Sequence, residues 1–238
     1  MYITRIAHFL AALALAALAT GCATAGRGAT TANDPWEGFN RGVFGFNEGL
    51  DKAVLKPVAQ GYNFVMPDFA KEGVNNFFAN LDDVPTGLNN VLQGKVGDGF
   101  ADLGRFAINS VFGIFGLWDV ASPLGLEKHE EDFGQTLAVW GVNSGPYLVL
   151  PLFGPSNLRD GPARVVTPSW FYGEWIGDRE TWGLFVLDVI RTRDNLTQAE
   201  SVVQQAALDK YSFIRDAWTQ RRRSATYDGS PPRPKEED

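Results

Sequence analysis

The chain has very few residues of the kinds that bind metals or carry covalent catalysis. It contains one cysteine, Cys22, and two histidines among 238 residues, and it has neither a Gly-x-Ser-x-Gly motif nor a phosphate loop. A zinc site draws mainly on cysteine and histidine, and a disulfide needs two thiols. The adjacent carboxylates Glu130, Glu131 and Asp132 do not share one face of a helix. We therefore expect no metal, no cofactor and no enzymatic activity.

Positive charge and long apolar runs are also scarce. The chain has 21 Lys and Arg against 28 Asp and Glu, a net charge of −7, whereas a nucleic-acid partner requires clustered basic residues. After residue 21, the longest apolar runs are 111–118 and 147–153. Both are shorter than the ~18 residues that cross a bilayer as one helix. We expect contact with a membrane only through an anchor and amphipathic surfaces.

The first 33 residues read as an export signal followed by a tether. Arg5 precedes an apolar run over 6–18, and small residues then lead into Cys22. The sequence 18–22 resembles the lipobox of bacterial lipoproteins, in which the cysteine sulfur receives a diacylglyceryl group. We predict a signal peptide over 1–21, a lipid anchor on Cys22 and a flexible tether over 22–33. The alternative is a chance cysteine beside an ordinary cleavage site.

The rest of the chain predicts one all-α domain over 34–227 and a disordered tail over 228–238. Apolar residues recur at Trp36, Phe39, Val43, Phe46 and Leu50, which is the spacing of one helical face. Hydrophobic residues make up 45% of the chain, enough for a sizeable core. Further helices are predicted over 57–66, 68–80, 97–118, 130–140, 158–166, 169–176, 179–208 and 209–223, with a turn at 82–85.

A narrow polar stripe runs along the segment 97–118. Asp98, Asp102, Arg105 and Asn109 follow one another at helical spacing, while apolar residues cover most of the remaining circumference. A surface helix in water has the opposite proportions. Two interpretations stay open. The segment is a core helix with a few satisfied polar groups, or it has lipid or protein around it and its stripe lines a water-filled pore.

A second distinctive segment covers 141–154. A loop rich in turn formers, with Gly145 and Pro146, leads into the apolar stretch from Tyr147 past Pro151 to Gly154. Proline cannot donate to a sheet ladder, so Pro151 interrupts a central strand. The segment is either an ordinary buried loop or a hairpin tip that gates a passage or dips into acyl chains.

Several motifs, in one order along the chain, together resemble the MlaA (VacJ) family of outer-membrane phospholipid-binding lipoproteins. The resemblance covers roughly 34–227, and residues 209–218 are similar to the family's C-terminal helix. The motifs are Asp34-Pro35-Trp36-Glu37-Gly38-Phe39-Asn40-Arg41, Phe46-Asn47, Asn80-Leu81 to Pro85, Leu92-Gln93-Gly94, Arg105 to Ser110, Gly116 to Ala121, Glu131 to Leu137, Trp140 to Val142, Gly145 to Pro151, Gly154 to Ser156 and Arg159-Asp160.

The resemblance implies a ring-like α-helical domain with a polar central channel, seated in the inner leaflet of the outer membrane at its periplasmic face. Such a protein binds trimeric porins and removes mislocalised phospholipids from the outer leaflet. It hands them to a periplasmic carrier that feeds an inner-membrane ABC-transporter complex. Ala23 is compatible with outer-membrane sorting. Asp98, Asp102, Arg105 and Asn109 are then candidate channel-lining residues, and Gly145, Pro146, Tyr147, Pro151 and Gly154 belong to a candidate gating loop.

Two other functions remain open from the sequence. One is a structural lipoprotein that braces porins or tethers the envelope without moving lipid. The other is an envelope hydrolase acting on lipid or glycan, for which His129 and Glu131 would be the residues to test. The anchor and the amphipathic helices suit both transport and bracing, and the polar stripe separates these two, because a brace has no need of a water-filled interior.

Overall fold

A computed structural model describes residues 34–164 and 178–232. The predicted signal peptide, Cys22, the tether, the helix predicted over 169–176 and the last six residues lie outside these ranges. The described part is mostly helical, which confirms the predicted all-α class. Its helices are α2 (Glu37–Leu50), the π-helical turn η1 (Asp51–Leu55), α3 (Lys56–Val65), α4 (Asp68–Leu92), α5 (Val96–Phe112), the short 3-10 turn η2 (Ser122–Leu124), α6 (Phe133–Val139), α8 (Asp178–Asn195), α9 (Thr197–Ala206) and α10 (Lys210–Thr226).

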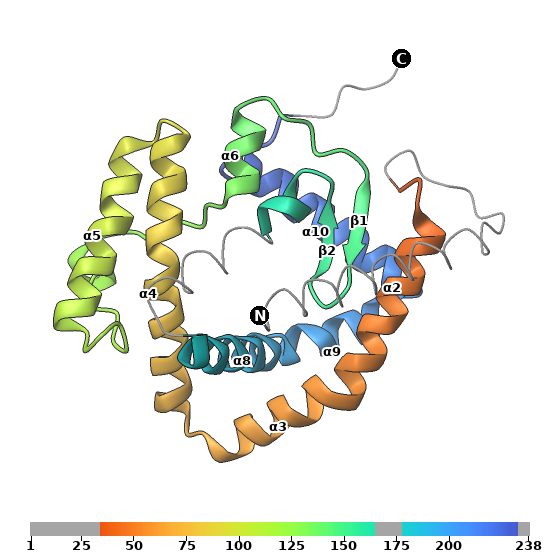
Figure 1. Ribbon diagram of the computed structural model, residues 1–238, viewed down its shortest axis with the longest axis horizontal. Helices are drawn as coiled ribbons and strands as arrows, with labels where there is room; N and C mark the ends of the chain where they lie inside the picture. Colours follow the sequence, from red (N-terminus) through yellow and green to blue (C-terminus); the bar gives the residue numbers. More distant parts are fainter. Residues whose placement is uncertain (1–33, 165–177, 233–238) are drawn as a thin grey trace.

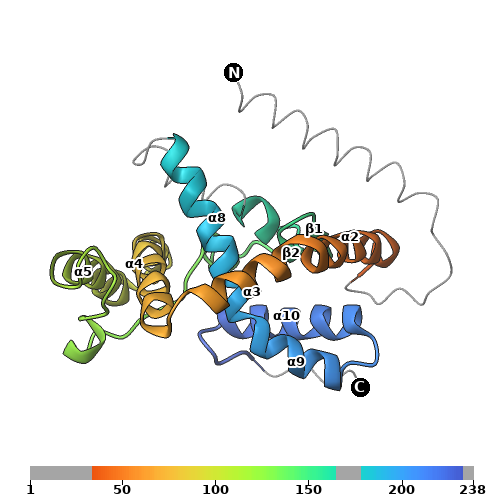
Figure 2. The ribbon, with the colours of Figure 1, turned by 90° about the horizontal axis from the view of Figure 1, so that it is seen from below.

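The helices follow the edge of a flat molecule. In Figure 1, α2, α3 and α4 run along three successive sides, α6 and α10 lie on the fourth, and α8 and α9 pass between them. In Figure 2, α2 to α5 form one layer, α9 and α10 lie on one side of it, and the start of α8 projects on the other. No helix in the described ranges is both long and apolar enough to cross a membrane.

A small β-hairpin occupies the segment for which the sequence left a buried loop and a hairpin tip open. Strands β1 (Tyr147–Leu150) and β2 (Gly154–Asn157) pair antiparallel, with Leu150 opposite Gly154. The strand β1 ends one residue before Pro151, as expected from the missing N–H of proline. The hairpin packs between α2 and α10, where Val43, Val149 and Tyr211 form the small apolar core together with Tyr147. The segment 147–154 is therefore a hairpin and its tip.

The turn predicted at 82–85 is wrong, because α4 continues through Pro85. Packing against α5 explains the continuation. At Gly87 an added Cβ would lie 2.8 Å from the Gly99 carbonyl oxygen, so the two backbones touch there. Buried polar contacts also hold the helix on both sides of the proline, from Asp83 to Lys128 and from Asn90 to Asp102. These tertiary contacts outweigh the local cost of proline in a helix.

Helix α5 ends at Phe112, earlier than the predicted Trp118. The chain reverses there through three consecutive left-handed residues, Ile114 (φ 51°), Phe115 (φ 56°) and Gly116 (φ 87°). An added Cβ at Gly116 would lie 2.6 Å from the side-chain nitrogen of Asn80, so only glycine fits. The turn brings residues 117–129 back along α4 and α5 as a strap. The predicted helix over 179–208 is likewise two helices, α8 and α9, and α6 begins at Phe133 because Asp132 caps it.

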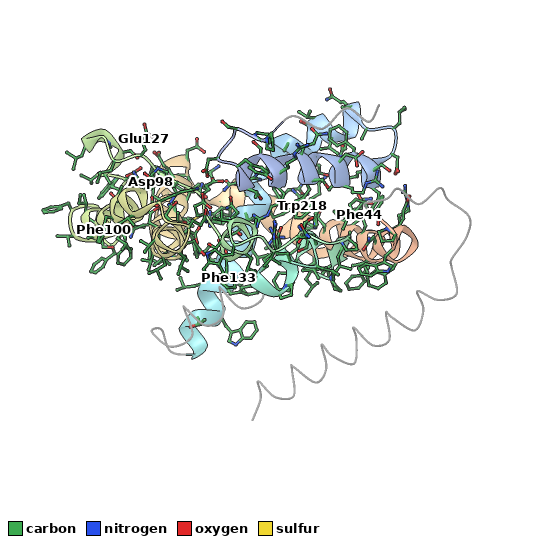
Figure 3. All side chains as sticks on the ribbon, turned by 90° about the horizontal axis from the view of Figure 1, so that it is seen from above. Phe44, Asp98, Phe100, Glu127, Phe133 and Trp218 are labelled. Carbon is green, nitrogen blue, oxygen red and sulfur yellow. The ribbon has the colours of Figure 1, made fainter. Side chains whose placement is uncertain are left out.

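The interior of the described part is unusually polar. Glycines aside, sixteen of its buried residues are polar or charged and eight are apolar. Many large apolar side chains are exposed instead, among them Phe64 (92%), Phe100 (68%), Phe112 (72%) and Phe115 (78%). Figure 3 shows Phe100 on the outer side of α5 and Trp218 toward the middle of the molecule. The arrangement inverts the usual one for a protein surrounded by water.

Candidate functional site

A cavity of about 590 Å³ lies in the middle of the molecule, where α4, α6, α8 and α10 approach one another. Its wall carries charges of both signs together with a few apolar groups such as Phe133 and Trp218. The lining residues are Ala79, Asp82, Pro85, Thr86, Asn89, Lys128 to Gln135, Ser156, Asp160, Ala163, Arg164, Arg191, Trp218, Arg221, Arg222 and Ala225.

Hydrogen bonds fasten the segment 130–136 to α4 on one side of the cavity. The Thr136 hydroxyl donates to Asn89 Oδ1 at 2.7 Å. Gln93 Nε2 donates to Glu131 Oε2 at 2.8 Å, and Lys95 Nζ lies 2.9 Å from the other oxygen of Glu131. The Glu131 carboxylate thus has two partners and is structural rather than free for acid–base chemistry.

An ion cluster closes the other side of the cavity. Arg222 on α10 donates to both oxygens of Asp132, at 2.5 and 2.6 Å, and to Asp160 at 2.6 Å. Arg159 also donates to Asp160, at 2.7 Å. Burial opposes ionisation of Asp160, but the hydrogen bonds from Arg159 and Arg222 outweigh it and lower the pKa of its carboxyl below the usual 3.8. The Asp160 carboxylate is therefore held charged at neutral pH.

Arg164 lies between the cavity and the hairpin tip. Its Nη1 donates to the carbonyl oxygens of Phe153 and Pro155, at 3.2 and 3.0 Å. Burial lowers the pKa of this guanidinium below its usual value. The contacts fix the direction of the side chain without neutralising its charge.

Three of the four predicted channel-lining residues are buried. Asp102, Arg105 and Asn109 are 0%, 2% and 3% exposed, and Asp98 is about half exposed. They face α4 and the strap, not the cavity of about 590 Å³. This geometry supports the first of the two interpretations, a helix with satisfied polar groups. The apolar remainder of α5 faces outward, as the second interpretation expected. A channel-lining role for the four residues stays a prediction.

Polar groups of the strap form hydrogen bonds with side chains of the polar stripe. Arg105 donates to the Ser122 hydroxyl at 3.0 Å and to Asp119 at 3.1 Å, and Asn109 Oδ1 accepts from the backbone N–H groups of Val120 and Ala121. Burial of Asp119 disfavours its charge, but the bonds from Ser122, Asn109 and Arg105 outweigh burial and lower its pKa to about 2. The stripe therefore fastens 119–122 to α5.

The candidate gating loop is held by two asparagines of α2. Asn40 donates to the Tyr147 carbonyl at 3.1 Å and accepts from the Val149 N–H at 2.9 Å. Asn47, two turns further on, donates to the Leu150 carbonyl at 3.0 Å and accepts from the Leu152 N–H at 2.8 Å. The two amides pair with the free edge of β1 as a third strand would. We call Asn40 and Asn47 the asparagine clasp.

The five loop residues have different surroundings. Tyr147 is buried in the apolar core, while Gly145, two residues before β1, and Gly154, the first residue of β2, have positive φ. Pro146 and Pro151 lie at the ends of β1. A gating role for these residues stays a prediction.

The resemblance implied a polar central channel, but the residues that line the cavity were not predicted, because its wall comes from segments far apart in the chain. The signal was nevertheless present in the motifs. Residues 131–135, Ser156 and Asp160 belong to segments that carry the family resemblance, and all of them line the cavity. Glu130, Glu131 and Asp132 were weighed only as a catalytic group. His129 contacts Asp102 with Nδ1 at 3.0 Å, and the described residues contain no cluster suited to a metal ion.

The model of a known family matches most of the chain. It is described as "MlaA lipoprotein" and covers residues 32–225. The chain belongs to the MlaA lipoprotein family. The resemblance seen in the sequence is thereby confirmed.

Proteins of three other bacteria match over most of their length, and two of them carry the MlaA name. An intermembrane phospholipid transport system lipoprotein MlaA of Escherichia coli is 34% identical over 217 residues, covering 89% of this chain and 86% of the relative. The protein of that name from Haemophilus influenzae is 33% identical, covering 92% and 90%. A protein of Rickettsia bellii is 38% identical over 199 residues, covering 81% and 76%.

The fold also matches a solved structure. That structure comes from work on the structural basis for maintenance of bacterial outer membrane lipid asymmetry. It superimposes with a TM-score of 0.70 at 32% sequence identity, covering 83% of this chain and 99% of the other. The helical arrangement described above is therefore that of an MlaA protein.

Proposed function

We propose that this MlaA protein moves phospholipid headgroups through its central cavity and so removes mislocalised phospholipid from the outer leaflet of the outer membrane. Cys22 carries the lipid anchor, and the domain lies at the periplasmic face of that membrane. The named relatives belong to an intermembrane phospholipid transport system, and the structural relative concerns outer membrane lipid asymmetry. Both support the proposal.

The polar cavity is the observation that carries the proposal. A charged headgroup crosses hydrocarbon only at high cost, so it needs a polar route. The cavity offers such a route, with carboxylates and guanidinium groups on its wall and room for a headgroup in about 590 Å³. A lipoprotein that only braces its neighbours has no use for a charged interior of this size.

The exposed apolar side chains of α3, α4 and α5 support a position in lipid. Phe64, Phe69, Phe100, Phe112 and Phe115 are each at least two-thirds exposed. Burying a phenylalanine in an apolar medium contributes about 1.5–3 kcal/mol, so together they outweigh many weak polar contacts. Acyl chains or a protein partner covering this face would remove it from water.

We further propose the partners that the family resemblance implies. A trimeric porin covers part of the apolar face, and a periplasmic carrier receives the lipid for an inner-membrane ABC-transporter complex. A passive cavity gives transport no direction, so the direction comes from the carrier and the transporter. No covalent step is required, and the protein acts without enzymatic chemistry.

The test compares two substitutions on α10. Ala225 lines the cavity, whereas Ala217 is exposed on the same helix and does not. In a strain lacking the gene, the wild-type chain should reduce the phospholipid that an added phospholipase reaches on intact cells. Ala225→Trp should fail to do so because its indole fills the passage, and Ala217→Trp should act as the wild type.

Porin co-purification separates transport from bracing. Both variants should bind the porin as the wild type does, since neither substitution changes the exposed phenylalanines that the porin is proposed to cover. If Ala225→Trp restored the strain fully while the variant was folded, the cavity would not be the lipid route. The bracing function would then be favoured.

A further inference from the structure

Arg164 stands out in the cavity wall because its charge is not matched. Arg222 pairs with Asp132 and Asp160, Arg159 also pairs with Asp160, and Arg221 pairs with Glu130. Among the described residues no carboxylate lies within ion-pair distance of Arg164, so none of them pairs with its charge.

The surroundings of Arg164 favour an anion. The Arg164 side chain is exposed to solvent, but the protein around it takes away part of its water and lowers the pKa of its guanidinium. The neighbouring Arg221 and Arg222 lower that pKa further, while Asp132 and Asp160 only partly compensate. An anion placed against the guanidinium would relieve that penalty.

The geometry of the side chain is also prepared for a ligand. One amino group of the guanidinium is fixed by the carbonyl oxygens of Phe153 and Pro155. The other amino group and Nε have no hydrogen-bond acceptor among the described residues. An arginine held in one direction loses little entropy on binding and presents a planar fork to its ligand.

From these observations we propose that Arg164 forms a phosphate-binding subsite in the cavity wall, which holds the phosphodiester of a phospholipid headgroup. The subsite deepens the proposed function, on which it rests. A phosphate offers the oxygens that a guanidinium binds in a forked, charge-assisted manner. The subsite lies beside the hairpin tip, so a headgroup there would contact the end of the candidate gating loop.

The test measures binding to the full-length protein in detergent micelles by calorimetric titration. The probe is dihexanoyl phosphatidylglycerol, and dihexanoylglycerol supplies the same tails without phosphate. Arg164→Gln should bind the phospholipid at least about tenfold more weakly than the wild type, because a charge-assisted bond is lost. Binding of dihexanoylglycerol should not change.

Two further variants keep the result interpretable. Arg223→Gln removes the same charge from an exposed arginine of α10 that does not line the cavity, and it should bind as the wild type does. Arg164→Lys keeps the charge but loses the fork, so its affinity should lie between those of the wild type and Arg164→Gln. Equal losses in Arg164→Gln and Arg223→Gln would overturn the subsite.

Inorganic phosphate distinguishes the two sources of the anion. It should bind far more weakly than the short-chain phospholipid. Equal binding would mean that the subsite takes free phosphate and not a phospholipid headgroup. The outcomes also separate the subsite from the transport function. If Arg164→Gln bound the short-chain phospholipid as tightly as the wild type while the Ala217→Trp strain still removed surface phospholipid, the subsite alone would be overturned. A gene deletion without effect on surface phospholipid overturns the transport function and leaves the titration standing.

Discussion

At the scale of single residues, buried polar side chains hold elements together at positions where most domains bury apolar ones. Arg105 is 2% exposed and bonds to Ser122, Asp119 and the Leu126 carbonyl, with Asp83 nearby. A buried charge of this kind is stable only while its partners remain. The residue is therefore a structural centre of the α4–α5 region.

Replacement of Arg105 by leucine should destabilise the protein by about 3–5 kcal/mol, because it leaves buried carboxylates without their partner. Urea unfolding followed by circular dichroism measures the loss. Arg221→Leu breaks an exposed ion pair with Glu130 and should unfold as the wild type does. A folded, stable Arg105→Leu protein that failed only in lipid removal would instead support a channel-lining role.

Acid should weaken the ion cluster at the cavity. The pKa of Asp160 is lower in the folded protein than its ordinary 3.8, so its ionised form contributes stability above that pH. This contribution is lost as the pH falls below about 3.8 and through the folded pKa. Melting temperatures between pH 3 and 7 should therefore fall more steeply at the acid end for the wild type than for Asp160→Asn. Parallel curves would contradict the assignment.

At the scale of elements, α4 and α5 approach each other through glycine. An added Cβ at Gly99 would lie 2.6 Å from Val91 Cγ2 and 2.8 Å from the Gly87 carbonyl oxygen, whereas one at Gly104 meets nothing within 4 Å. Gly99→Ala should cost about 1–3 kcal/mol because the helices must separate. Gly104→Ala should stabilise by about 0.5–1 kcal/mol. Thermal unfolding of the two variants gives the comparison, and a stable Gly99→Ala protein would refute the close contact.

The asparagine clasp makes a local prediction about the hairpin. Asn47→Ala removes the partners of the Leu150 carbonyl and the Leu152 N–H, so the tip should open more often. The Leu152 amide should exchange with solvent deuterium at least about tenfold faster, as the loss of one hydrogen bond implies. Asn63→Ala, which removes a bond to Asp194 on the far side of the molecule, should leave that amide unchanged.

The sequence predicted a helix correctly where apolar residues recur at the spacing of one helical face. Helix α2 was expected over 36–50 and spans Glu37–Leu50, since its aromatic face has regular spacing. The polar stripe was also identified correctly as one face. Periodicity shows which residues share a face but not what that face contacts, so a buried stripe and a pore-lining stripe both stayed open until the contacts with α4 were seen. Pro85 was misread because only tertiary packing makes a helix through it stable.

The site was less predictable than the elements. The cavity is formed by residues from 79 to 225, and no local pattern links Ala79, Asp160 and Arg222. The family motifs include part of the wall, and the resemblance implied a central channel, but neither indicated which residues line it. Arg164 lies outside those motifs, and its unmatched charge became visible only once its neighbours were paired.

At the scale of the whole molecule, the outer face should contact lipid. A nitroxide label introduced by Phe112→Cys, in the full-length protein in phospholipid vesicles, should collide more often with dissolved oxygen than with a water-soluble nickel complex. A label at Leu208, which is exposed between α9 and α10 on the opposite layer, should show the reverse. The same preference at both positions would contradict a membrane-facing side formed by α5.

The inverted distribution of side chains has a consequence for heat capacity. Unfolding normally raises the heat capacity because it brings buried apolar surface into water, while newly exposed polar groups lower it. In the α4–α5 region the apolar side chains are already outside and the groups that become exposed are Asp102, Arg105 and Asn109. The enthalpy of unfolding should therefore change little with temperature. The curve of stability against temperature should be flatter than that of a water-soluble domain of equal length.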